Sequence, residues 1–134
     1  MALHFTDTEF ADRKARLLAG MKAADIDALL MFRQESMYWL TGYDTFGYVY
    51  FQSLVLTTDG RVVLLTRAPD LRQAQNTSNI ADIRIWVDRD RASPADNLRA
   101  ILDELGLRGG RLGVEYEAYG LTGRNAMRVN AALG

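Results

Sequence analysis

The residues best suited to binding chemistry form one aromatic segment of the chain, from Glu35 to Phe51. This segment holds more than half of all the aromatic side chains, together with two glycines. Tyr and Trp join a large apolar face to a polar tip, which suits them to contact a ligand or a partner. Buried rings are also common in protein cores, so either role stays open for each ring.

A loop between a helix end and a strand presents the candidate residues, and binding groups concentrate on loops held by rigid elements. If that strand begins early, Tyr48 and Tyr50 share one of its faces. Arg67 follows the strand that we expect to pair with this one. Its guanidinium could bind a carboxylate or lie free in solvent. We expect Tyr43, Phe46 and Tyr48 to lie partly exposed at one end of a sheet. The full set of predicted substrate or partner contacts is Tyr43, Asp44, Phe46, Tyr48, Tyr50 and Arg67.

Catalytic and metal chemistry find little support in the sequence, and we predict no catalytic residue and no metal site. The only histidine is His4, near a chain end, and there is no cysteine. Such a chain cannot build a multi-histidine or thiolate metal site. Glu115 and Glu117 could share a strand face and bind a cation, although a solvated strand end explains them better. The glycines at 106–113 follow a helix and precede a strand, which is the wrong order for a nucleotide loop.

Composition is typical of a single globular domain over residues 1–134, with 49% hydrophobic and 25% charged residues. A net charge of -1 and a pI near 5.8 give no basic footprint for nucleic acid or an anionic membrane. No apolar run has the ~18 residues of a membrane span, and the start lacks signal-peptide features. We therefore expect a cytoplasmic protein.

Helical and extended patterns alternate along the chain. Thr6 and Glu9 form a capping box before the first helix, and Asp59-Gly60 is a two-residue hairpin turn. Because the hairpin imposes an antiparallel pair, we predict an α/β fold in which helices flank a mixed sheet in three layers. The predicted helices are 7–24, 35–41 ending at Gly42, 70–76, 94–105 and 123–133; the predicted strands are 28–32, 50–57, 61–66, 83–87 and 111–115.

In this order and spacing, the elements resemble the N-terminal domain of the creatinase/prolidase family, the pita-bread metallopeptidases and their relatives. The segment 37–43, Met-Tyr-Trp-Leu-Thr-Gly-Tyr, is similar to the family's Tyr-Leu-Thr-Gly-Phe pattern, with Trp39 for Tyr and Tyr43 for Phe. Further matching positions are Arg13, Leu17, Met21, Asp27-Ala28-Leu29-Leu30, Asp59-Gly60 and Arg111-Leu-Gly-Val-Glu115.

The resemblance implies a ribonuclease H-like, non-catalytic domain that precedes a catalytic pita-bread domain absent from this chain. In such Xaa-Pro dipeptidases and aminopeptidases, two divalent metals (manganese, zinc or cobalt) lie in the catalytic domain. It also implies a homodimer, a contribution to the substrate pocket, and a peptide or small amide substrate. The alternatives are a metal-independent, creatinase-like amidinohydrolase and a stand-alone protein-interaction module of the same architecture.

Overall fold

Local capping sets the start of the first helix in the computed structural model, which describes residues 3–134. The hydroxyl of Thr6 accepts the amide of Glu9, and the Glu9 carboxylate accepts the amide of Thr6. The rings of Phe5 and Phe10 meet edge to face at 5.8 Å, which completes a hydrophobic staple. Helix α1 then runs over Asp7–Ala23, as the capping box predicts.

Glycines and caps also bound the later elements as predicted. Gly42 ends α2 with a φ of 85°, a left-handed conformation that favours glycine. Thr122 caps the last helix by accepting the amide of Asn125. The helices after α1 are α2 (Gln34–Thr41), α3 (Leu71–Thr77), α4 (Pro94–Glu104) and α5 (Gly123–Leu133), with short 3₁₀ helices at Phe46–Val49 and Ala68–Asp70.

The sheet described within residues 3–134 has five strands in the order β4-β3-β2-β1-β5. Strands β2 and β3 form the antiparallel hairpin that Asp59-Gly60 predicts, and β1 pairs antiparallel with β2. The outer pairs, β1 with β5 and β3 with β4, are parallel. The strands are β1 (Ala28–Met31), β2 (Ser53–Thr57), β3 (Val62–Arg67), β4 (Asp82–Trp86) and β5 (Leu112–Val114). The mixed sheet is thus confirmed.

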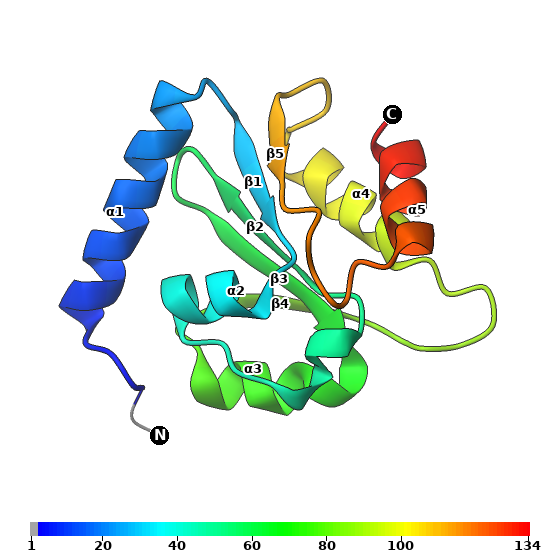
Figure 1. Cartoon of the computed structure of the whole chain (residues 1–134), viewed down its shortest axis with the longest axis horizontal. Helices are drawn as coiled ribbons and strands as arrows, with labels where there is room; N and C mark the ends of the chain where they lie inside the picture. Colours follow the sequence, from blue (N-terminus) through cyan, green and yellow to red (C-terminus); the bar gives the residue numbers. More distant parts are fainter. Residues whose placement is uncertain (1–2) are drawn as a thin grey trace.

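Helices cover both faces of the sheet, which gives the predicted three layers (Figure 1). Alternate strand residues face opposite sides, so each face has its own apolar cluster. On one face, α4 and α5 pack over strand residues such as Leu30 and Val55. On the other, α1, α2 and α3 pack over Met31, Leu54 and Leu56. None of the helices described in residues 3–134 is both long and apolar enough to cross a membrane.

One predicted strand start is wrong by three residues, whereas the others agree within one. Strand β2 begins at Ser53 and not at Tyr50, because residues 46–49 form a 3₁₀ turn. The hydroxyl of Thr45 caps this turn by accepting the amide of Gly47, and the amide of Tyr50 donates back to the Gly47 carbonyl. Consequently, Tyr48 and Tyr50 do not share a strand face.

Candidate functional site

The candidate site lies at the edge of the sheet where β1, β3, β4 and β5 have their carboxyl ends (Figure 1). At the same edge, the 3₁₀ turn leads into the amino end of β2. In open α/β sheets, ligands generally bind outside the carboxyl ends of the strands. The aromatic turn therefore lies where the topology favours a binding site.

A buried carboxylate anchors the turn. The Thr45 hydroxyl donates to Asp70 Oδ1 at 2.7 Å and accepts the amide of Gly47 at 3.1 Å. A Cβ on Gly47 would overlap the Asp70 carboxylate, so a larger residue here would displace Asp70 from the turn. Asp70 itself is buried. This anchor was not among the predicted site residues; the Thr45-x-Gly47 spacing, typical of a hydroxyl-capped turn, was the signal that could have found it.

A second glycine lies against the backbone of the turn. A Cβ on Gly120 would lie 2.0 Å from the carbonyl oxygen of Tyr50 and 3.2 Å from that of Tyr48. Gly120 follows β5, which is distant in sequence, so this contact depends on the parallel pairing of β1 with β5. Close packing at Gly47 and Gly120 therefore sets the backbone position of the turn.

The anchored turn presents its side chains to solvent. Phe46 is 89% exposed, and Tyr48 and Tyr50 are each 42% exposed. Exposing a ring of this size forgoes the burial that normally stabilises a fold, and several exposed rings in one short turn favour a contact surface. The exposure predicted for Phe46 and Tyr48 is confirmed. Asp44, at the start of the loop, is also exposed.

The exposure predicted for Tyr43 is wrong, because its side chain is fully buried. Its hydroxyl donates to Gln52 Oε1 at 3.0 Å and lies 2.9 Å from the Thr66 hydroxyl. The Gln34 amide donates to the Tyr43 carbonyl and accepts from Gln52, which closes a buried polar network. Burial raises the pKa of Tyr43 to about 12, and nearby Asp70 adds to the shift. Tyr43 supports the loop from beneath.

Arg67 is not a solvent-exposed loop side chain, which was one of the two expectations for it. Its guanidinium carbon lies 3.5 Å from the ring centroid of Tyr50, and its Nε lies 3.8 Å from Asp70 Oδ2. Its side chain is 19% exposed, and Nε is buried without a hydrogen bond. Stacking on an aromatic face and a carboxylate behind it fix the guanidinium at the edge of the sheet.

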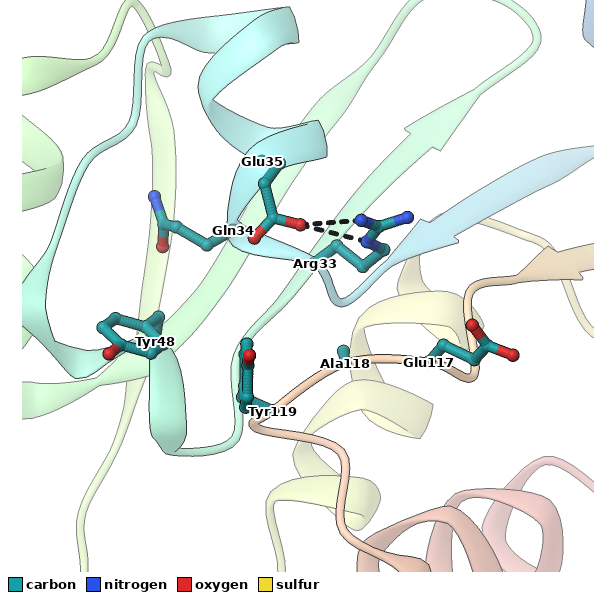
Figure 2. A pocket seen from close by; sticks show the side chains of 7 residues that line it. All are labelled: Arg33, Gln34, Glu35, Tyr48, Glu117, Ala118 and Tyr119. Atoms are coloured by element: carbon teal, nitrogen blue, oxygen red, sulfur yellow. Dashed lines mark hydrogen bonds and ion pairs between the residues drawn. The ribbon is translucent and has the colours of Figure 1, made fainter.

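The pocket nearest these rings has a volume of about 370 Å³ and opens at the carboxyl ends of β1 and β5. Figure 2 shows Tyr48 on one side and the segment after β5 on the other. The rings of Tyr48 and Tyr119 meet edge to face at 5.7 Å. Of the predicted contacts, only Tyr48 lines it; the lining residues are Arg33, Gln34, Glu35, Tyr48, Glu117, Ala118 and Tyr119.

The two glutamates after β5, Glu115 and Glu117, have separate roles and therefore do not form the shared cation site considered from the sequence. Glu115 accepts the amides of Phe32 and Arg33, each at 3.1 Å, and the Ser36 hydroxyl at 2.6 Å. It is therefore a structural carboxylate, and the solvated strand end expected for it is wrong. Glu117 lines the pocket. Within residues 3–134, no three His, Asp or Glu side chains are grouped to hold a metal.

The comparisons with known proteins agree on one family. The family model described as "Creatinase/Prolidase N-terminal domain" matches residues 13–134. An uncharacterised hydrolase/peptidase of Sinorhizobium fredii is 30% identical over 138 residues, covering 98% of this chain and 35% of its own length. Ectoine hydrolase of Halomonas elongata is 29% identical over 133 residues, covering 89% of this chain and 32% of its own length. The chain thus spans about a third of these curated relatives.

Solved structures share the fold. The N-terminal domain of an Xaa-Pro dipeptidase from Lactobacillus brevis superposes with a TM-score of 0.76 at 10% sequence identity. The match covers 91% of this chain and 88% of that one. At so low an identity, the likeness shows the architecture alone.

Proposed function

The chain belongs to the creatinase/prolidase N-terminal domain family, and on that premise we propose that it serves a hydrolase as a non-catalytic, contact-making domain. Its relatives by sequence include hydrolases, one of them named a hydrolase/peptidase. The favoured parent is an Xaa-Pro dipeptidase or aminopeptidase that acts on peptides. The partners of the domain are then a catalytic domain of the same protein and a second subunit of a homodimer.

One observation carries the proposal: an exposed aromatic turn is anchored by buried polar groups. Burial of the Phe46 side chain contributes almost nothing to folding stability, because the residue is 89% exposed. Yet Asp70 and Gly120 hold the turn that presents it. A ring fixed in place and left uncovered supports a role in contact with a substrate or a partner subunit.

Catalysis is assigned to another part of the protein. The described residues group no metal ligands, so two divalent ions (manganese, zinc or cobalt) do not fit here. We place such metals in the catalytic domain, and the role of this domain is to position and to bind.

A second candidate follows from ectoine hydrolase, because this relative is named for a cyclic amidine substrate rather than a peptide. On this alternative, the parent hydrolyses a small amide or amidine, as a creatinase-like enzyme does, without metal. The exposed rings of Phe46, Tyr48 and Tyr50 can contact a substrate of either class, so the aromatic turn suits both.

The test is to express the reading frame that contains this chain and to assay hydrolysis of Xaa-Pro dipeptides and of cyclic amidines, with and without added metal. Metal-dependent cleavage of Xaa-Pro bonds supports the peptidase, and metal-independent cleavage of the amidine supports the alternative. Hydrolysis of neither class would overturn the hydrolase proposal and leave the interaction module.

A further inference from the structure

The pocket at the carboxyl ends of β1 and β5 has walls of unequal charge. One wall is the start of α2, where Arg33 is bound to Glu35 through Nε at 3.1 Å and through its terminal nitrogen at 2.9 Å. The positive charge of Arg33 and the negative charge of Glu35 therefore balance each other. The other wall follows β5 and contains Glu117, for which no ion pair or hydrogen bond forms with any residue from 3 to 134. Among residues 3–134, the exposed carboxylate of Glu117 therefore has no cationic side chain paired with it.

Aromatic rings form the third side. Tyr48 and Tyr119 come from segments far apart in sequence, and their centroids lie 5.7 Å apart with planes at 72°. The rings offer a cation a contact with an aromatic face, an attraction that operates within about 6 Å of the centroid. Figure 2 shows both rings at one end of the pocket, opposite the Arg33 and Glu35 pair.

The Gln34 side chain of the lining is already bonded within the protein. The Gln34 amide nitrogen is committed to the Tyr43 carbonyl at 2.7 Å, and its oxygen accepts from Gln52 at 2.9 Å. The amino end of α2 carries a partial positive charge, but Glu35 lies in its first turn and opposes it. The guanidinium of Arg33 is already paired. With Arg33 and Glu35 balancing each other, Glu117 leaves the lining with a net charge of -1, which disfavours a carboxylate or a phosphate.

We propose that this pocket binds a small organic cation, an ammonium or amidinium group, between the tyrosine pair and Glu117. A volume of about 370 Å³ suits a ligand of amino-acid size. The identity of the cation rests on the proposed function. For a peptidase it is the amino terminus of a peptide, and for the alternative enzyme it is the amidinium of a cyclic substrate. Arg33 and Glu35 form the fixed wall opposite.

The experiment is an NMR titration of the isotope-labelled 134-residue chain at constant ionic strength. The probes are glycinamide for the ammonium, acetamidinium for the amidinium, and acetate as an anion of similar size. We expect saturable shifts at the amides of Gln34, Glu117 and Tyr119 with either cation at concentrations of roughly 10 mM, and none with acetate. The cation that binds more tightly distinguishes the two sources.

Two variants and two controls assign the site. Glu117→Gln and Tyr119→Leu should each weaken binding about threefold or more, because each removes one attraction. Tyr116→Leu, a half-exposed ring on the same segment that lies outside the pocket, should bind as the wild type does. Asp88→Asn removes an exposed charge elsewhere and should also have no effect.

Equal shifts with acetate, absence of saturable shifts with both cations, or wild-type affinity in both variants would each overturn the proposal. If Tyr119→Leu does not fold by circular dichroism, Glu117→Gln alone decides, since it keeps the shape of the side chain. The titration needs no catalysis, so the cation site and the hydrolase proposal can fail independently.

Discussion

Removal of one hydroxyl group tests whether the buried network under the aromatic loop supports the fold. In Tyr43→Phe, the Oε1 atom of Gln52 loses the donor that lies 3.0 Å away, and the Thr66 hydroxyl loses its 2.9 Å partner. The ring stays in place, so no large cavity forms. A buried acceptor left without a donor costs about 1–3 kcal/mol of unfolding free energy. For a chain of this length, about 2 kcal/mol corresponds to a Tm lower by roughly 6–10 °C.

The assay is urea unfolding followed by circular dichroism, with Tyr48→Phe as the matched control. Tyr48 is 42% exposed and makes no comparable buried hydrogen bond within residues 3–134, so its hydroxyl should contribute less than about 0.5 kcal/mol. The urea slope should stay constant in both variants, which confines the effect to stability. If both variants unfold at the wild-type midpoint, the network does not stabilise the domain.

The same pair of proteins should differ in their response to pH. Because burial raises the pKa of Tyr43 to about 12, the unfolded chain loses this proton near pH 10 while the folded chain keeps it. Stability from this group is complete below pH 10 and falls by about 1.4 kcal/mol per pH unit as pH rises from 10 toward 12. Tyr43→Phe lacks this loss, so its deficit relative to the wild type should shrink above pH 10. A constant difference would contradict the burial argument.

Three further predictions follow from the contacts around the turn and from the metal-binding side chains of residues 3–134. Gly120→Ala should destabilise the domain by about 1–3 kcal/mol in urea unfolding because its Cβ would meet the Tyr50 carbonyl, whereas Gly123→Ala, which meets nothing within 4 Å, should not. Asp70→Ala should cost about 1–3 kcal/mol and speed amide exchange in the 3₁₀ turn, since the Thr45 hydroxyl loses its acceptor; unchanged exchange would refute the anchor. The 134-residue chain should hydrolyse no Xaa-Pro dipeptide with manganese, zinc or cobalt, because its described residues group no metal ligands; metal-dependent turnover by a pure sample would refute this.

The elements were predictable where their signals are local. Thr6 with Glu9, Gly42 and Asp59-Gly60 each determine a cap or turn within a few residues, and the structure has all three. The mixed sheet followed from the hairpin, because an antiparallel pair within alternating helices and strands excludes an all-parallel sheet.

The parts of the site that could not be predicted from the sequence depend on the pairing of strands far apart in the chain. Tyr43 reads as one more loop aromatic, and only the pairing of β2 with β3 places Gln52 and Thr66 around its hydroxyl. Similarly, Gly120 and Tyr119 reach the turn because β5 lies beside β1, at the end of the strand order. The exposed rings were found because loop position and composition alone suggest a surface.

Whether Phe46 makes a functional contact is best tested by kcat/KM of Phe46→Ala in the complete hydrolase that contains this domain, together with the unfolding free energy of the same variant. We expect kcat/KM or the dimer association constant to fall roughly 30-fold, about 2 kcal/mol, as for a side chain central to a contact. Unfolding of the 134-residue chain should stay within about 0.5 kcal/mol, because the ring is 89% exposed. Tyr116→Ala serves as the control ring outside the turn. An unchanged kcat/KM and dimer affinity with a destabilised domain would contradict the account, since Phe46 would then act in folding and not in binding.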